Sequence, residues 1–259
     1  MIAPLDFLAK SLAIAQVELK KLFRDPTELV SRAVQPVLWL AVFGQVFSQV
    51  RGIPTGNIGY LAFMTPGILA QSVLFAAIFY GIAVIWERDL GVIHKLLVSP
   101  SPRGALVFGK AIAAGFRGLL QAAIIYVIAF AMHIPLRTEP AAVAGVLAVV
   151  VLGAGVFSTF SLIIACIVKT RERFMGVGQV LTMPLFFASN AIYPLSLMPD
   201  WLRVVARANP LTYLVDALRM LMIEGGQGAH SLAMNFTVLG GVFVVFVVIA
   251  ARLYPTLVE

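Results

Sequence analysis

The residues best suited to chemistry in this chain are charged side chains that crowd into one polar stretch, residues 86–110. This stretch reads WERDLGVIHKLLVSPSPRGALVFGK, in a chain of 259 residues of which only 12% are charged. Four apolar residues recur within it at helical spacing: Leu90, Ile93, Leu96 and Leu97. Asp89 is suited to be the N-cap of that helix, and Pro100 stops it. A helix of about nine residues is too short to cross a bilayer, so we expect it to dock against another surface.

Residue patterns that would indicate an enzyme are missing from the sequence. There is no P-loop pattern GxxxxGK[ST], so we expect the chain itself to bind no ATP. No HExxH, Cys-x-x-Cys or three-histidine cluster indicates a metal site. His94, His133 and His230 fall in predicted loops, where we expect solvated side chains, and the single cysteine, Cys166, lies in an apolar run. The sequence therefore predicts a protein that is not an enzyme and holds neither a metal nor a cofactor.

The elements that must position the polar stretch are membrane helices. The chain is 61% hydrophobic with a mean hydropathy of +0.97, and runs of about 20 apolar residues recur along it. The net charge of +7 is explained by cytoplasmic loops and contact with anionic lipid, and we expect no binding of nucleic acid.

We expect an all-α integral membrane fold with six transmembrane helices in a single domain, residues 1–259. The predicted spans are residues 29–50, 60–86, 105–132, 141–168, 175–193 and 233–253. Before them, residues 5–24 form an amphipathic helix in the plane of the membrane surface. Before the last span, residues 200–208 and 212–224 form a hairpin of two short helices that do not cross.

The distribution of basic residues predicts the orientation. Of the nineteen lysines and arginines, thirteen fall on the side of the two termini, five on the other side, and Arg117 lies within a span. Because cytoplasmic loops are enriched in Lys and Arg, we expect a multi-pass protein of the cell (plasma or inner) membrane with both termini cytoplasmic. The polar stretch is then cytoplasmic and the hairpin external.

Polar residues inside the predicted spans are candidates for a translocation pathway. Arg103, Lys110 and Arg117 recur every seven residues, with Gln121 on roughly the same face. Such a stripe either leads into a pathway or reaches back to the cytoplasmic headgroups, and the sequence leaves both open. Three further residues either contact substrate or form hydrogen bonds between helices: Gln71, Gln179 and Asn190.

Carboxylates are placed in a way that argues against an ion-coupled carrier. No Asp or Glu lies in the middle of a predicted span, whereas such carriers usually need one there. Asp216 and Arg219 stand three residues apart on the second short helix of the hairpin, so we expect them to neutralise one another.

Two stretches make the chain resemble the permease subunits of type-2 ABC exporters, especially the drug-resistance branch typified by daunorubicin-efflux permeases. ERDLGVIHKLLVSPSPRGALVFGK, from Glu87, is similar to the family's cytoplasmic loop between the second and third spans. NPLTYLVDALRMLMIEGG, from Asn209, is similar to its segment before the last span. The resemblance extends over essentially the whole length and implies efflux, with antibiotic resistance as one outcome.

The resemblance also implies partners and site residues. A separate P-loop ABC ATPase subunit would hold ATP and Mg, and a second permease, identical or a paralogue, would complete a dimer within membrane lipids. The coupling helix that contacts the ATPase would comprise Glu87, Arg88, Asp89, Leu90, Gly91, Ile93, Lys95, Leu96, Leu97 and Pro100. The external gate hairpin would include Asn209, Pro210, Tyr213, Asp216 and Arg219. The pathway candidates are Lys110, Arg117, Gln121, Gln71, Gln179 and Asn190.

Two alternatives stay open at this point. One is a type-2 ABC exporter of a lipid or polysaccharide in place of a drug. The other is a membrane assembly or scaffold protein that uses no ATPase. A P-loop ATPase gene beside this one would favour an exporter over a scaffold.

Overall fold

The computed structural model describes residues 4–23, 34–49, 55, 58–98, 102–168 and 170–257. Within these residues the chain is helical and has no β-strand; a single bridge joins Leu136 to Ile223. The predicted all-α class is therefore confirmed.

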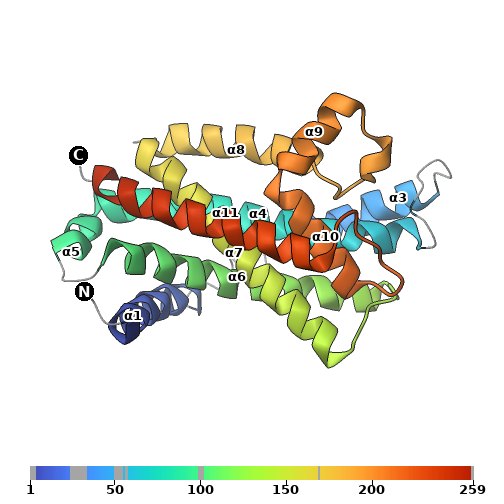
Figure 1. Ribbon diagram of the computed structural model, residues 1–259, viewed down its shortest axis with the longest axis horizontal. Helices are drawn as coiled ribbons and strands as arrows, with labels where there is room; N and C mark the ends of the chain where they lie inside the picture. Colours follow the sequence, from blue (N-terminus) through green and yellow to red (C-terminus); the bar gives the residue numbers. More distant parts are fainter. Residues whose placement is uncertain are drawn as a thin grey trace.

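Four helices form the body of the molecule and run along its long axis (Figure 1). They are α4 (Tyr60–Asp89), α6 (Arg103–Ala131), α7 (Pro140–Ile167) and α11 (Leu232–Leu253). Among the described residues, these four are long and apolar enough to cross a membrane, which agrees with four of the predicted spans. α7 lies at the centre and packs against α4, α6, α10 and α11, whereas α11 is the least buried of the four.

Two shorter helices occupy the positions of the other predicted spans. The helix Val34–Ser48 contains a π-helical segment, η1 (Trp39–Gly44), followed by α3 (Gln45–Ser48). Residues 29–33 and 50 of that predicted span lie outside the described residues. α8 (Arg171–Phe187) begins four residues before its predicted span and ends six before that span's end, because the chain turns at residues 188–191.

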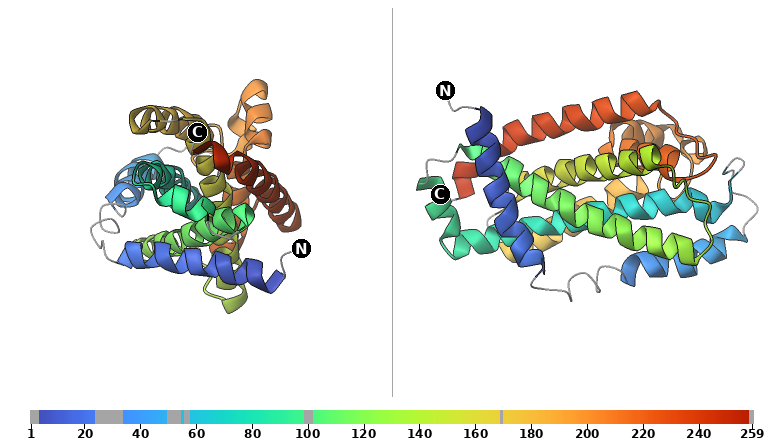
Figure 2. Two further views of the ribbon diagram at one scale, coloured as in Figure 1. Left: turned by 90° about the vertical axis from the view of Figure 1, so that its left-hand side faces the viewer. Right: turned by 90° about the horizontal axis from the view of Figure 1, so that it is seen from below.

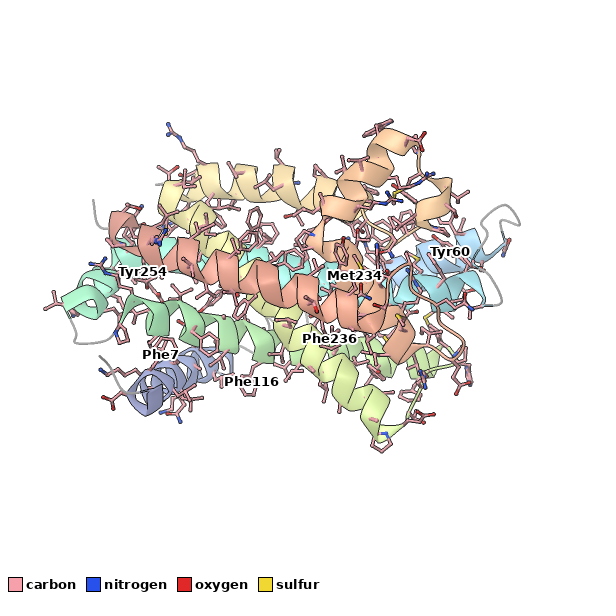
Figure 3. The ribbon with its side chains drawn as sticks, in the orientation of Figure 1. Phe7, Tyr60, Phe116, Met234, Phe236 and Tyr254 are labelled. Carbon is pink, nitrogen blue, oxygen red and sulfur yellow. The ribbon has the colours of Figure 1, made fainter. Side chains whose placement is uncertain are left out.

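The N-terminal helix α1 (Pro4–Phe23) runs across the bundle, at the end where both termini lie (Figure 2). It packs on α6 through a face of small and polar residues, on which Ser11, Ala15 and Glu18 are buried. Phe7 lies between the two helices, with its ring 6.0 Å from that of Phe108 (Figure 3). Of the predicted apolar stripe, Leu8 and Leu12 are exposed, Leu19 is half-buried, and Ala15 is buried on the face that packs on α6. Exposed leucines such as Leu8 and Leu12 suit a helix at a lipid surface, and that location stays a prediction.

The predicted hairpin lies at the opposite end of the bundle from the termini (Figure 1). A 3-10 turn, η2 (Leu195–Leu197), leads into α9 (Asp200–Ala208) and α10 (Pro210–Met222). α9 has the predicted bounds. α10 begins two residues earlier than predicted because Asn209 caps it: its Oδ1 accepts a hydrogen bond of 3.0 Å from the backbone N–H of Leu211. Pro210 then occupies the first helical position, which needs no N–H donor.

Candidate functional site

The polar stretch forms a corner at the end of α4. α4 continues through Asp89, and the N–H groups of Leu90 and Gly91 still bond back to Trp86 and Arg88 at 3.0 and 2.9 Å. Gly91 then adopts a φ of +72°, a left-handed conformation that stops the helix, and α5 (Val92–Val98) follows. The prediction that Asp89 is the N-cap of the short helix is therefore wrong, because Asp89 ends the preceding helix.

Asp89 ties this corner to the start of α8. Its carboxylate accepts hydrogen bonds from Arg88 at 2.8 Å and from Arg171 at 2.7 Å. The guanidinium of Arg171 also stacks over the ring of Trp86, 3.4 Å from its centroid. The corner is thus held from outside α5, which leaves the outer face of α5 uncovered.

The two faces of α5 have different environments. Ile93 is completely buried and packs in a cluster with Ile85, Leu106 and Phe174, so it does not present its side chain at the surface. In contrast, Val98 at the end of α5 is 88% exposed, and Leu90, just before Gly91, is 71% exposed.

The remaining residues predicted to contact an ATPase are also spread over several environments. Glu87 is buried, Arg88 and Leu96 are half-buried, and Lys95 is exposed. The side chain of Leu97 and all of Pro100 lie outside what the structure describes. Among the described side chains of residues 90–98, the exposed apolar ones are Leu90, Val92 and Val98.

Behind α5, four charged side chains from three helices form a buried ion cluster. Lys110 Nζ of α6 donates to Glu87 of α4 at 2.6 Å and to Glu18 of α1 at 3.2 Å. Arg117, two turns further along α6, lies 3.8 Å from Glu18 and stacks over the Tyr80 ring at 4.4 Å. All four side chains are between 4% and 11% exposed. Two cations and two carboxylates balance, which offsets the desolvation of each.

This cluster gives Lys110 and Arg117 partners that the sequence did not assign to them. The sequence left two roles open for these side chains, lining a translocation pathway or contacting the lipid headgroups. The pathway role stays a prediction. Glu18 was missed because it lies 92 residues from Lys110 along the chain. A signal was available: Ser11, Ala15 and Glu18 follow one another at helical spacing on the face of α1 that carries little apolar area.

A second polar cluster lies at the hairpin end. Asp216, completely buried, accepts hydrogen bonds from Asn190 Nδ2 at 2.5 Å and from the backbone N–H of His230 at 3.0 Å. His230 Nδ1 lies 2.9 Å from the same carboxylate. Arg219 stands 3.8 Å from Asp216, as expected for a neutralising pair. The expectation that His230 is solvated is wrong, because Asp216 holds it against α10.

Arg219 extends this cluster to α4. Its Nη2 donates to the backbone carbonyl of Asn190 at 2.7 Å, and its guanidinium stacks 3.8 Å from the centroid of the Phe63 ring. Burial lowers the pKa of Arg219 to about 10, and the nearby Asp216 carboxylate opposes that shift. The cluster thus joins α4, the turn after α8, α10 and the loop before α11.

Two other residues predicted to form the external gate hold the hairpin in place, Asn209 by bonds to the end of α8 and Tyr213 by a bond within the hairpin. Asn209 Nδ2 donates to the carbonyls of Leu185 and Ala188 at 2.7 and 2.9 Å. The Tyr213 hydroxyl donates to the carbonyl of Arg207 at 2.7 Å.

The remaining pathway candidates lie on different helices. Gln71 on α4 and Gln121 on α6 are buried, whereas Gln179 on α8 is exposed. No group of three His, Cys, Asp or Glu side chains suited to a metal ion occurs within the part of the chain that the structure describes.

Comparison with known proteins supplies the family. Residues 10–223 match the family described as ABC-2 type transporter. The chain is 31% identical over 213 residues to a protein of Cyanophora paradoxa named as a transport permease, ycf38, with 79% of this chain and 72% of the relative covered. It is 26% identical to the daunorubicin resistance ABC transporter permease protein DrrB1 of Streptomyces coeruleorubidus, covering 88% and 80%. It is also 26% identical to the inner membrane transport permease YadH of Escherichia coli K12, covering 91% and 90%. Together with its long apolar helices, these matches mean that the chain belongs to the ABC-2 type transporter family of multi-pass membrane permeases.

Proposed function

We propose that this chain is the transmembrane subunit of an ATP-driven exporter that moves hydrophobic or amphiphilic compounds out of the cell. A separate P-loop ATPase subunit binds ATP and Mg and hydrolyses the ATP. The helix Val34–Ser48 and α8 complete six spans with the four long helices, and both termini face the cytoplasm. α1 and α5 lie at the end of the bundle that carries the termini, where a cytoplasmic partner can reach them (Figure 2).

The observation that carries this proposal is the corner at Gly91. It places two apolar side chains at the surface: Leu90, which follows α4 and is 71% exposed, and Val98, the last residue of α5, which is 88% exposed. Ile93 anchors the seven-residue helix α5 from behind. Exposed apolar side chains of this size next to an anchored helix can insert into an apolar groove of a partner protein. Lys95 and Asp89, at the edge of this contact, can fix the position of the helix in the groove. The family assignment makes an ABC ATPase the partner that this surface fits.

The buried ion cluster is the route by which motion of α5 reaches the rest of the protein. Glu87 lies at the end of α4, four residues before Gly91, and Lys110 joins it to α6 and to Glu18 of α1. Because separating a buried ion pair is costly, a force on the corner moves these three helices together. α1 therefore serves as a cytoplasmic connecting helix that follows α5.

At the opposite end, the hairpin closes the external side of a pathway formed with a second permease subunit. The Asp216 cluster and the hydrogen bonds of Asn209 and Tyr213 give the hairpin one defined closed position. The similarity to the Streptomyces daunorubicin resistance permease supports drugs or antibiotics as the transported class.

The proposal is tested by co-expressing the chain with the P-loop ATPase encoded by a neighbouring gene. The complex should co-purify with stoichiometric ATPase, and the double variant Leu90→Asp with Val98→Asp should lose it. Val204→Asp is the matched control, since Val204 is 66% exposed on α9 at the opposite end. Full ATPase association in the double variant would contradict the proposed contact.

Substrate class is tested separately, by ATP hydrolysis of the reconstituted complex with drugs, lipids and glycans. We expect stimulation by hydrophobic or amphiphilic drugs. Stimulation only by a lipid or a glycan would assign the chain to the corresponding exporters. The absence of any ATPase partner would favour a scaffold.

A further inference from the structure

A cavity of about 220 Å³ lies between α1 and α5, at the end of the bundle that carries both termini (Figure 2). α1 packs on α6 and α5 packs on α4, so residues from four helices enclose the cavity. The residues that line it all lie within the described ranges 4–23, 58–98 and 102–168. The cavity therefore adjoins the helix that follows the Gly91 corner, on the side that faces α1.

The walls of this cavity are mostly apolar. Ile14 and Val17 come from α1, Val92 and Leu96 from α5, and Leu106 from α6. Val17 and Val92 are exposed, whereas Leu106 is buried, so the cavity runs from the surface toward α6. An ordered water needs two to four polar partners, which these side chains do not offer. The walls therefore favour an apolar occupant over water.

The charged side chains that also line the cavity belong to the buried ion cluster. They are Glu18, Glu87 and Lys110. Lys110 Nζ lies 2.6 Å from Glu87 and 3.2 Å from Glu18, so these charges are already paired with one another. A charged ligand of either sign would lose its hydration and would have to compete with these ion pairs for a counter-charge. An uncharged ligand avoids that cost, so the cavity selects against ions.

The volume limits the size of the ligand. An apolar cavity of about 150 Å³ is large enough to bind benzene. Pockets for drug-sized molecules start at about 300 Å³. At about 220 Å³, this cavity lies between these two sizes and suits one substituted aromatic ring.

We propose that this cavity binds a small uncharged apolar molecule of the size of one substituted aromatic ring. The ligand contacts α1 on one side and α5 on the other, so its binding restricts the movement of α5. An effect of that restriction on coupling to an ATPase rests on the proposed function. The binding itself does not, and it can be measured without an ATPase.

The test is methyl NMR on the full chain, labelled at isoleucine, leucine and valine, in phosphatidylcholine nanodiscs. The uncharged probe is 4-fluorotoluene, and 4-fluorobenzylamine and 4-fluorobenzoate are its charged counterparts. We expect a saturable shift of the Ile14, Val92 and Leu106 methyl signals with the uncharged probe, and at least tenfold weaker binding of the charged ones. Val244, exposed on α11, reports simple partition into the lipid and should shift without saturation. Equal binding of all three probes, or no saturable shift at the cavity, would overturn the proposal.

The variant Ala13→Phe fills the cavity from an exposed position of α1 that takes no part in the ion cluster. It should weaken binding of 4-fluorotoluene at least tenfold. Ala9→Phe, exposed one turn earlier on the same helix, is the matched control and should bind like the parent chain. Val17→Trp replaces Ala13→Phe if circular dichroism shows that the latter does not fold. Parent-like affinity in the folded blocking variant would refute the site.

The effect on α5 is measured by amide hydrogen exchange of residues 92–98. Saturating 4-fluorotoluene should slow this exchange at least threefold in the parent chain and leave it unchanged in Ala13→Phe. Saturable binding without slower exchange would overturn the proposed restriction of α5. Neither measurement involves transport, so failure of the exporter proposal would leave both results valid.

Discussion

Replacement of Lys110 by methionine should destabilise the protein far more than the same replacement on its surface. Lys110 Nζ lies 2.6 Å from Glu87 and 3.2 Å from Glu18, and its side chain is 4% exposed. Methionine keeps most of the volume but removes the ammonium, which leaves buried carboxylates without their shared cation. Loss of one partner from a buried ion pair costs about 3–5 kcal/mol.

The measurement is the free energy of unfolding of the isolated chain in detergent micelles, followed by circular dichroism during denaturant titration. Lys20→Met is the matched control, because Lys20 is exposed on α1 two residues after Glu18. A surface change of this kind should stay within about 0.5 kcal/mol of the parent. A difference between the two variants of under 1 kcal/mol would refute the buried cluster.

A double variant separates lost charge balance from lost packing. Lys110→Met combined with Glu87→Gln removes one charge of each sign, so the remaining Glu18 and Arg117 still balance. Because neutral replacement of both members of a buried pair is often close to neutral, we expect recovery of more than half of the loss. If the double variant is as unstable as Lys110→Met alone, packing around Lys110 explains the effect and charge does not.

Three further changes test other parts of the structure. Gly91→Val should destabilise the corner by about 1–2 kcal/mol because Gly91 has a φ of +72°, and Gly91→Asn should cost less in the same thermal unfolding assay. Gly67→Ala should lower the free energy of unfolding by about 1–3 kcal/mol, because the added Cβ would overlap the backbone of Ala191. Gly240→Ala is the control: no atom lies near the added Cβ, so the melting temperature should not fall. Asp216→Asn should cost about 3–5 kcal/mol in denaturant unfolding because the buried arginine on the same helix loses its counter-charge; a loss below 1 kcal/mol would contradict that pairing.

The sequence predicted the long helices well, because their apolar runs are continuous and end at Gly, Pro or charged residues. The first short helix of the hairpin has its predicted bounds for a related reason, because Pro199 and Asn209 occupy its N-cap and C-cap positions. The shorter helix α8 was predicted less well. Hydropathy extends to Tyr193, but the chain turns earlier so that Asn190 can reach Asp216.

The inward face of α5 and the ion-pair partners of the α6 side chains were harder to predict, because both depend on tertiary contacts. The periodicity of residues 90–97 shows that α5 is two-sided, yet it cannot say which side packs on the same chain. Ile93 proved to face inward, whereas Val92 and Val98 face outward. Likewise, a basic stripe on α6 was visible, but the carboxylate of Glu18 that balances it comes from a helix 92 residues away.

The length of α4 has a mechanical consequence. Its 30 residues form one helix of about 45 Å, fastened near its start by Arg219 against Phe63 and near its end by Glu87 with Lys110. Because both ends of α4 are held by contacts, the helix moves along its axis as one unit, whereas these contacts oppose tilting of the helix. A weak point along it is Pro66, which lacks the N–H that would bond one turn back. Tilting imposed at the Gly91 corner therefore concentrates as bending at Pro66, three residues from the clamp at Phe63.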